Sequence, residues 1–417
     1  MRIIADLHIH SKYSRAVSQE MTLENIALWA AKKGITIMGT GDFTHPLWFE
    51  EIKTKLEPSE EGLYRLKSQN QNFKSETRFM LTVEISSIYS KGGKVRKVHN
   101  IVFAPSIEIA EKINNRLKWI GNLNSDGRPI LGLDSKELLK IILDIDSRCV
   151  LIPAHAWTPW FSVFGSMSGF NSLEECFEEL TPHIFAIETG LSSDPKMNWR
   201  LSNLDKISLI SNSDSHSLQK IGREANVFDC DLRYDAIFDA IKTKDPKKFL
   251  FTIEFFPEEG KYHYDGHRLC NVSFSPEETK KHNGICPVCG GKLTIGVLNR
   301  VEELSDREDK DIDIKKYIPY KSLIPLDEII ADIFGIGKAS KKVSEMYERA
   351  IKEIGPEFEI LLDASYDKIS QFDERLAIAI KNVREGRVNL IPGYDGEYGK
   401  ISILKDKIDD NNQPRLF

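Results

Sequence analysis

Two histidines near the N-terminus are the first residues whose spacing suggests chemistry. In Asp6-Leu7-His8-Ile9-His10 a short apolar run ends in polar side chains, and His8 and His10 are two positions apart. Residues two apart in a strand point to the same side, so these imidazoles could share one metal ion. On its own, the pair would fit a hydrogen-bonded surface pair equally well.

Carboxylates and further histidines occur at or near the ends of later apolar runs, where a (β/α) barrel carries its chemistry. They are Asp42, Glu84, His99, His155, Glu188, Asp214 and His216. We expect most of them to form one metal centre with the first two histidines; the alternative is a hydrogen-bond network. Mixed carboxylate and imidazole ligands suit Zn²⁺, Mn²⁺ or Fe²⁺ better than Ca²⁺ or Mg²⁺ alone. Since adjacent ions activate a bound water and hold phosphoryl oxygens, the expected chemistry is hydrolysis of a phosphate ester.

The elements that must position these residues alternate between strand-like and helix-like segments as far as residue 255. Apolar runs predict strands at 2–7, 35–40, 79–85, 98–104, 150–153, 184–189, 207–211 and 249–254. Periodic apolar residues predict helices at 22–34, 106–121, 135–146 and 234–242. This alternation predicts parallel pairing, and so many units in one stretch favour a closed barrel. The polar segment 59–78 is expected to be an excursion, and the charged run 302–316 a solvated linker.

Length and composition limit the classes of protein. At roughly 150 residues per domain, the 417 residues correspond to two or three domains. With 57 Lys and Arg against 63 Asp and Glu, the net charge of −6 excludes a strongly basic, histone-like binder but not a local cationic groove. Proline and glycine interrupt the longest uncharged stretch, 149–173, so no membrane span is expected. Six cysteines without a secretion pattern indicate a reducing, cytoplasmic location.

Four residues in the 256–300 region have the spacing of a structural zinc site. His267 and Cys270 are followed, after fifteen intervening residues, by Cys286 and Cys289. Two such pairs supply four ligands from two tight turns, which suits tetrahedral zinc in a closed, structural site. His263 is the alternative for the fourth position, and unrelated free cysteines are the alternative to a zinc site.

The order of the motifs resembles the polymerase and histidinol phosphatase (PHP) superfamily. The motifs are D-x-H-x-H at 6–10, T-G-D at 40–42, Glu84, His99, P-A-H at 153–155 and S-D-S-H at 213–216. The resemblance implies a distorted (β/α)7 barrel with up to three ions. It implies three ligand groups: His8, His10, Glu84 and Asp214; Glu84, His99 and His155; His216 and Asp42. Where the superfamily has T-D-H, this sequence has Phe43 instead of the histidine, and His45 is the nearby substitute.

The zinc motif and the residues after it extend the resemblance to one family, endonuclease Q. The matching segments include G-T-G-D at 39–42, P-A-H-A-x-T-P-W at 153–160, G-K-Y-H at 260–263 and P-G-Y-x-G-x-Y-G-K at 392–400. The resemblance implies a catalytic barrel at 1–255, a zinc module at 256–300 and a mainly helical, DNA-binding region with a flexible tail at 301–417. It also implies nicking of DNA on the 5′ side of hypoxanthine, uracil, xanthine and abasic sites.

Such an enzyme needs cations for phosphates and apolar side chains for a base that leaves the helix. A cationic hairpin just before His99 is formed by Lys91, Lys94, Arg96 and Lys97; the alternative is a solvated turn. Four aromatic residues follow His155, and we expect at least one of them to line the base pocket or act as a wedge rather than simply pack a loop. They are Trp157, Trp160, Phe161 and Phe164.

The expected activity is that of a metal-dependent endodeoxyribonuclease whose partner is DNA with deaminated or abasic nucleotides. An activated water attacks the phosphorus in line and the 3′ oxygen leaves, giving a 3′-hydroxyl and a 5′-phosphate. Zn²⁺ is expected in the zinc module and in the barrel, with Mg²⁺ or Mn²⁺ as catalytic alternatives. The residues expected to act in catalysis are Asp214, His216, Glu84 and Asp42. The alternatives are a small-molecule phosphatase of the histidinol-phosphate type and a non-catalytic DNA-binding scaffold.

The last residues form a short apolar peptide after an acidic, Asn-rich run. Gln413, Leu416 and Phe417 match the Q-x-x-L-F pattern of peptides that dock into the hydrophobic pocket of sliding clamps. We therefore expect a tethered tail that binds a clamp. A chance match, or a tail folded back on the protein, is the alternative.

Overall fold

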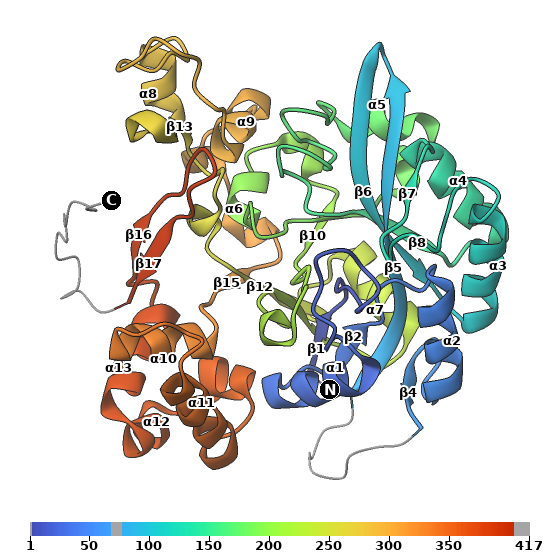
Figure 1. Ribbon diagram of the computed structural model, residues 1–417, viewed down its shortest axis with the longest axis horizontal. Coiled ribbons are helices and arrows are strands. Elements are labelled where there is room, and N and C mark those ends of the chain that lie inside the picture. The colour runs from blue at the N-terminus through green and yellow to red at the C-terminus, as the bar shows by residue number, and fades with distance from the viewer. Residues whose placement is uncertain (1, 68–76, 404–417) are drawn as a thin grey trace.

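β1 (Arg2–Asp6) lies in the middle of the main sheet of this computed structural model, which describes residues 2–67 and 77–403 (Figure 1). The sheet has 11 strands in the order β15-β12-β11-β1-β2-β5-β4-β3, with β6 beside β5 and β8, and β7 beside β5. The strands are β2 (Ile37–Gly39), β3 (Leu56–Pro58), β4 (Tyr64–Leu66), β5 (Arg78–Lys91), β6 (Lys94–Ala104), β7 (Ile130–Leu131), β8 (Val150–Pro153), β11 (Ala225–Asp229), β12 (Phe249–Glu254) and β15 (Tyr320–Ser322). β9 (Ala186–Glu188) and β10 (Ser208–Ile210) form a separate parallel pair.

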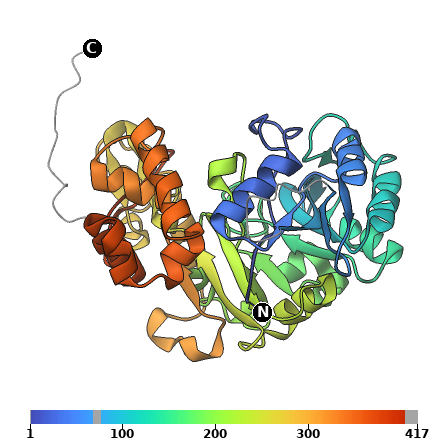
Figure 2. The same ribbon diagram turned by 90° about the horizontal axis from the view of Figure 1, so that it is seen from below.

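Helices cover this sheet and also form a cluster beside it. Around the sheet lie α1 (Leu23–Lys33), α2 (Pro46–Lys55), α3 (Ile107–Leu117), α4 (Ser135–Ile145), α5 (Leu173–Phe177), α6 (Pro195–Asn198) and α7 (Tyr234–Thr243). The helices that follow are α8 (Pro276–Lys281), α9 (Val297–Leu304), α10 (Leu326–Phe334), α11 (Lys341–Glu353), α12 (Tyr366–Phe372) and α13 (Glu374–Arg384). Short antiparallel pairs join β13 (Asp265–His267) to β14 (Val272–Phe274), and β16 (Asn389–Ile391) to β17 (Lys400–Ser402). Figure 2 shows α10–α13 gathered to one side of the sheet.

The mixed α/β fold predicted from the sequence is confirmed, but uniform parallel pairing is wrong. β1 pairs in parallel with β2, and β2 with β5, whereas β1 is antiparallel to β11 and β5 is antiparallel to β6. The strand β11 was not predicted, and β4 lies in the segment expected to be an excursion. The seven-unit count of the barrel stays a prediction.

The β5–β6 pair is antiparallel because its turn is too short for a crossover. Only Gly92 and Gly93 separate the strands, with φ of 61° and 73°. Two residues with positive φ form the hairpin turn whose twist matches that of the strands. The hairpin extends past the neighbouring strands in Figure 1 and carries Glu84 and His99 on its two strands.

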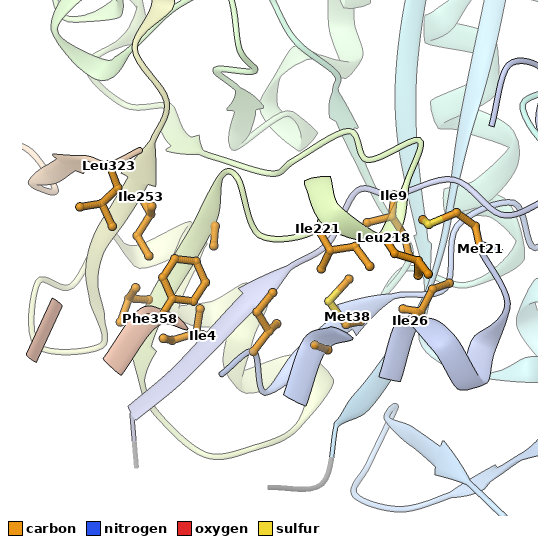
Figure 3. Close-up of a cluster of buried hydrophobic side chains, with 14 of the residues drawn as sticks. Ile4, Ile9, Met21, Ile26, Met38, Leu218, Ile221, Ile253, Leu323 and Phe358 are labelled. Carbon is orange, nitrogen blue, oxygen red and sulfur yellow. The ribbon is translucent and has the colours of Figure 1, made fainter. Parts of the chain in front are cut away.

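The C-terminal helices are packed against the sheet by buried contacts. Figure 3 shows Phe358 beside Ile4 of β1, and Leu323 beside Ile253 of β12. Next to this cluster, Lys33 of α1 forms a buried ion pair with Glu357, with Nζ 2.9 Å from Oε2. Breaking such a pair would leave an unpaired charge in the interior, so this contact fixes the helices where they are.

The segment 302–316 is largely exposed, as expected of a solvated linker, but several of its side chains contact the rest of the chain. Arg307 forms an ion pair with Asp205 and donates a 2.8 Å hydrogen bond to the carbonyl of Trp199. Just beyond the segment, the ring of Tyr317 stacks on Trp199 at a centroid distance of 4.9 Å. Charged side chains of this segment therefore hold it against the region that contains Trp199 and Asp205.

Some predictions concern residues outside the described ranges. The clamp-binding tail with Gln413 lies there, as does part of segment 59–78. None of the described helices combines the length and the apolar character that crossing a membrane requires. The domain boundaries at 255 and 300 stay predictions.

A buried carboxyl at the end of β12 predicts a pH-dependent stability. Glu254 accepts hydrogen bonds from Thr189 and Thr252, and burial raises its pKa from 4.5 to about 8. The folded protein therefore holds this proton more tightly than the unfolded chain does. Its contribution to the free energy of unfolding is full below pH 4.5 and is lost as the pH rises through about 8. We expect Glu254→Gln to flatten this dependence in urea titrations across that range.

Glu137→Gln, at an exposed position of α4, is the control and should keep the wild-type dependence. Part of the dependence should remain in Glu254→Gln, because burial also raises the pKa of the neighbouring Glu224. An unchanged pH dependence in Glu254→Gln would contradict the raised pKa.

Candidate metal centre and cleft

The two N-terminal histidines are each held from behind by a buried carboxylate. Nδ1 of His8 lies 3.0 and 3.1 Å from the carboxylate oxygens of Glu188, and Nδ1 of His10 lies 3.1 Å from Oδ1 of Asp42. Donation of Nδ1–H to a carboxylate fixes the tautomer and leaves Nε2 as the free, basic nitrogen. Both imidazoles are thereby prepared as ligands.

The two Nε2 atoms face Glu84 and Asp214. Nε2 of His10 lies 3.1 Å from Oδ1 of Asp214 and 3.4 Å from Oε2 of Glu84, and Nε2 of His8 lies 3.7 Å from one oxygen of each. Neither Nε2 has a hydrogen-bond partner within the described residues, although both are buried. Ligand atoms around a tetrahedral ion with bonds near 2.1 Å are about 3.4 Å apart. The ligand atoms of His8, His10 and Glu84 lie within 4.8 Å of one another and fit one divalent ion, and Asp214 lies beside them.

The carboxylates around His8 favour a positive charge at this position. Burial alone lowers the pKa of His8, but the carboxylates of Glu188, Glu84 and Asp214 outweigh it and raise the pKa to about 9. The carboxylates are thus compensated by a proton on the imidazole, which a metal ion would displace.

Glu84 also belongs to a second group on the other side. Its Oε1 lies 2.8 Å from Nδ1 of His99 and 3.0 Å from Nε2 of His155, and these two nitrogens are 3.2 Å apart. One carboxylate therefore lies between two sets of imidazoles. This is the arrangement expected of a bridging ligand for two adjacent ions.

The third group differs from the prediction. His216 comes together with His10 and Asp214, with ligand atoms within 4.8 Å of one another. Asp42 does not join them, because its carboxylate contacts His10 and accepts hydrogen bonds of 2.7–2.8 Å from Ser11 and Ser14. The placement of Asp42 as an ion ligand and catalytic group is therefore corrected to a positioning role. His45 stacks on Tyr13 and belongs to none of the groups found among the described residues.

Two candidate ligands occupy an unusual backbone conformation. His155 has φ of 28° and Asp214 has φ of 46°, values that non-glycine residues rarely adopt. His155 is held there by its N–H, which donates a 2.8 Å hydrogen bond to Glu188. Strain of this kind persists only where the surroundings enforce it, and it concentrates at functional sites.

A cleft of about 1490 Å³, open solvent included, leads away from the centre. His99, His155 and Asp214 line this cleft. Lys261, Tyr262, His263 and Tyr398, from the C-terminal half of the chain, also line it. Since the barrel and the following region both contribute walls, the cleft admits a ligand much larger than a small phosphate ester.

The two predicted tryptophans differ in their placement. Trp160 lines the cleft, is 39% exposed, and meets Tyr262 edge to face at 5.8 Å. Trp157 is fully buried, and its Nε1–H donates a 2.8 Å hydrogen bond to Asn198. Trp157 therefore supports the loop from beneath, and its prediction as a DNA-contacting residue is wrong for this structure.

The predicted cations lie on the β5–β6 hairpin. This hairpin starts at the candidate metal centre, and its turn lies far from that centre. Lys91 forms ion pairs with Asp134 and Glu178, so its charge is largely compensated. Arg96 packs over Phe170 at 4.1 Å and Lys97 over Phe161 at 5.3 Å. The exposed Lys94 is five residues, or about 17 Å of strand, from His99. Lys94, Arg96 and Lys97 remain predictions as phosphate contacts.

The zinc motif comes together as a compact group. One ligand atom from each of His267, Cys270, Cys286 and Cys289 lies within 4.8 Å of the others. His263 is not part of this group; it is buried beside the cleft, where its Nδ1 has no hydrogen-bond partner among the described residues. The donor set fits structural zinc, with two Cys-containing turns facing each other.

One cation at the centre was not predicted from the sequence. Nη1 of Arg128 lies 3.2 Å from Oε2 of Glu84, and its side chain lines the cleft. In the sequence it follows Asp126 and Gly127, which read as an ordinary turn. No sequence signal separates this arginine from other surface arginines.

The contact of Asp42 with His10 predicts an effect on metal affinity. We expect Asp42→Asn to weaken divalent-ion binding at the barrel centre by about 10–100-fold, because the carboxylate that orients His10 is lost. Competition with a fluorescent chelator would measure the affinity, and Asp144→Asn on the exposed face of α4 is the control. An affinity equal to wild type would show that Asp42 does not position the imidazole.

The zinc group predicts a stoichiometric loss of metal. Cys286→Ser should carry one zinc fewer per chain by elemental analysis, whereas Cys230→Ser, at an isolated cysteine, should keep the wild-type content. Since structural zinc stabilises small modules by about 10 kcal/mol, the 261–296 region should also become sensitive to protease. Equal zinc content in Cys286→Ser would remove this residue from the ligand set.

Known sequences match this chain over nearly its full length. A family described as the MJ0043 C-terminal domain matches residues 325–387. The uncharacterized protein YqxK of Bacillus subtilis is 31% identical over 419 residues, covering 96% of this chain and 99% of YqxK. The uncharacterized protein MJ0043 of Methanocaldococcus jannaschii is 36% identical over 264 residues, which are 61% of this chain and 32% of MJ0043. The chain thus spans about a third of the length of that second relative.

Two solved structures share the fold along its full length. The lesion-specific endonuclease PfuEndoQ from Pyrococcus furiosus has a TM-score of 0.85 and 32% identity, with 100% of both chains covered. An endonuclease Q in complex with a 27-mer duplex that has an abasic lesion at the active site has a TM-score of 0.83 and 33% identity, covering 99% of this chain and 100% of that one. These matches confirm the resemblance drawn from the motifs: the chain belongs to the endonuclease Q family.

Proposed function

We propose that the protein is a metal-dependent DNA repair endonuclease that nicks DNA on the 5′ side of deaminated bases and abasic sites. The bridging position of Glu84 between two imidazole groups, at the end of an open cleft, is the observation that carries this proposal. Membership of the endonuclease Q family supports an endonuclease activity for this chain. The abasic duplex in the related complex supports DNA with such a lesion as the partner.

The chain's own residues can hold the ions and orient the substrate. Divalent ions bound at this centre would supply Lewis acidity to the phosphate and to the attacking water. His8, His10, Glu84 and Asp214 would hold one ion, and Glu84, His99 and His155 the second. Asp214 differs from Glu84 in that 26% of its side chain is exposed, toward the cleft that it lines. We assign to Asp214 the fixing of the nucleophilic water and to His216 a place beside it.

The proposed reaction is hydrolysis with cleavage of the P–O3′ bond. Water adds to phosphorus and the 3′ oxygen leaves with a proton, which gives a 3′-hydroxyl and a 5′-phosphate. Zn²⁺ in the zinc module and Zn²⁺, Mn²⁺ or Mg²⁺ in the barrel suit the respective donor sets.

The lesion would be recognised in the cleft beside the centre. Trp160, Tyr262 and Tyr398 bring three aromatic rings to its wall. A base that has left the helix, whether hypoxanthine, uracil or xanthine, can stack on such rings. A clamp contact through Gln413, Leu416 and Phe417 completes the proposal, and it would keep the enzyme close to DNA.

A nicking assay tests the function. Duplexes carrying uracil, hypoxanthine, xanthine, an abasic site or no lesion are incubated with the wild type and Mn²⁺ or Mg²⁺, and the ends are mapped. Asp214→Asn should slow nicking by on the order of 10³ while damaged-DNA binding persists, because it weakens the hold on the ions and the water. Asp144→Asn should nick at the wild-type rate.

The assay separates the proposed nuclease from the alternative small-molecule phosphatase. Release of inorganic phosphate from small esters without nicking would indicate the histidinol-phosphate type of activity. Nicking by Asp214→Asn at the wild-type rate would contradict the role given to this carboxylate.

A further inference from the structure

The loop that precedes Arg128 packs closely against Asp42 at the candidate metal centre. Asp126 accepts hydrogen bonds of 3.1 Å from the N–H groups of Arg15 and Arg128, and the Gly127 N–H donates 3.0 Å to the carbonyl of Tyr13. A Cβ on Gly127 would lie 2.3 Å from Oδ2 of Asp42, so only glycine lets the loop approach this closely. The backbone before Arg128 is therefore held by Asp126 and Tyr13, and it packs directly against the carboxylate that contacts His10.

The guanidinium of Arg128 lies between the ligands and the cleft. Its Nη1 contacts Oε2 of Glu84 at 3.2 Å, and a quarter of the side chain is exposed. Within the described residues, Glu84 is the hydrogen-bond acceptor found for this guanidinium. The other N–H groups of the planar guanidinium are left as donors. His99, His155 and Asp214 line the same cleft beside it.

Arg128 is better placed than the other cations that line this cleft. The side chain of Arg15 is 78% exposed, at the rim, with Nε 3.8 Å from Asp126. Lys261 lies over the ring of Tyr398, with Nζ 5.1 Å from the ring centroid. Among these three cleft-lining cations, Arg128 is the one that contacts a candidate ion ligand directly.

We propose that Arg128 is a catalytic residue that binds a non-bridging oxygen of the scissile phosphate. This rests on the nuclease function proposed above. Oε2 of Glu84 faces both His10 and Arg128, so an ion held by Glu84 and His10 would compete with the guanidinium for this oxygen. The guanidinium is then available to the phosphate, where a charge-assisted pair gains strength as negative charge develops on the oxygens during attack by water.

The test uses a neutral analogue of the scissile linkage. Duplexes with an abasic site carry either a phosphodiester or a methylphosphonate at the position to be cut, so that one charged oxygen is removed. Binding to the metal-loaded protein is measured by fluorescence anisotropy for the wild type, Arg128→Ala, Arg128→Lys and Arg15→Ala. Single-turnover nicking and metal content per chain are measured on the same samples.

The expected result is a loss of discrimination together with a loss of rate. Wild type and Arg15→Ala should prefer the charged linkage, and Arg128→Ala should lose about tenfold or more of that preference. Nicking by Arg128→Ala should fall by about 10²–10³, with metal content unchanged, and guanidinium ions at millimolar concentration should restore part of it. Arg128→Lys keeps the positive charge but lacks the planar guanidinium. Its preference for the charged linkage and its nicking rate should lie between those of the wild type and Arg128→Ala.

Three results would overturn the proposal. One is unchanged discrimination and rate in both Arg128 variants. The second is a loss of barrel ions that accounts for the slower nicking, which would reduce Arg128 to a support for Glu84. The third is a wild type that nicks no lesion-bearing duplex, which would reject the nuclease function itself and is recognised without any variant.

Discussion

The rings of His8 and His10 can meet one metal ion only while buried carboxylates hold them from behind. Glu188 holds the first ring and Asp42 the second, and other segments fix each carboxylate in turn. The side-chain amide of Asn212, after β10, donates to Glu188, and the hydroxyls of the turn after β1 donate to Asp42. The centre thus depends on the mutual packing of β1, β2, β9 and β10. A displaced element at any of these places would misdirect an imidazole and lower affinity for the ion.

The cleft depends on a second set of contacts, which join the C-terminal half to the sheet. Arg300 of α9 is buried and donates 3.1 Å hydrogen bonds to the carbonyls of Phe164 and Phe170, in the loop that carries Trp160. Together with the ion pair of Lys33 and Glu357, this fixes the distance between the two walls. The aromatic wall is therefore held in place relative to the candidate metal ligands, as the proposed recognition of a lesion next to the cut would require.

The sequence allowed the strand ends and most members of the candidate metal-binding groups to be predicted, because a strand period and a motif order are local properties. How deeply a side chain is buried and which way it points are not local properties of the sequence. Asp42 and Trp157 occupy positions at strand ends like those of true cleft residues, but their side chains turn into the interior, where Ser11 and Asn198 satisfy them. Arg128 follows an Asp-Gly turn that looks like any surface loop. Its role arises from the close approach of Gly127 to Asp42, which only the folded chain shows.

The β5–β6 hairpin has a consequence for how the family can vary in length. Glu84 and His99 lie on paired strands, and side chains on a strand alternate between its two faces. Between these residues and the tip, insertions or deletions that add or remove one residue from each strand leave both ligands facing the ions. A single unpaired insertion would turn one of them away unless a bulge absorbed it. Natural relatives should therefore differ in the length of the hairpin between Glu84 and His99 mainly by even numbers of residues. The strand residues on the other side of Glu84 and His99 should be constant in number.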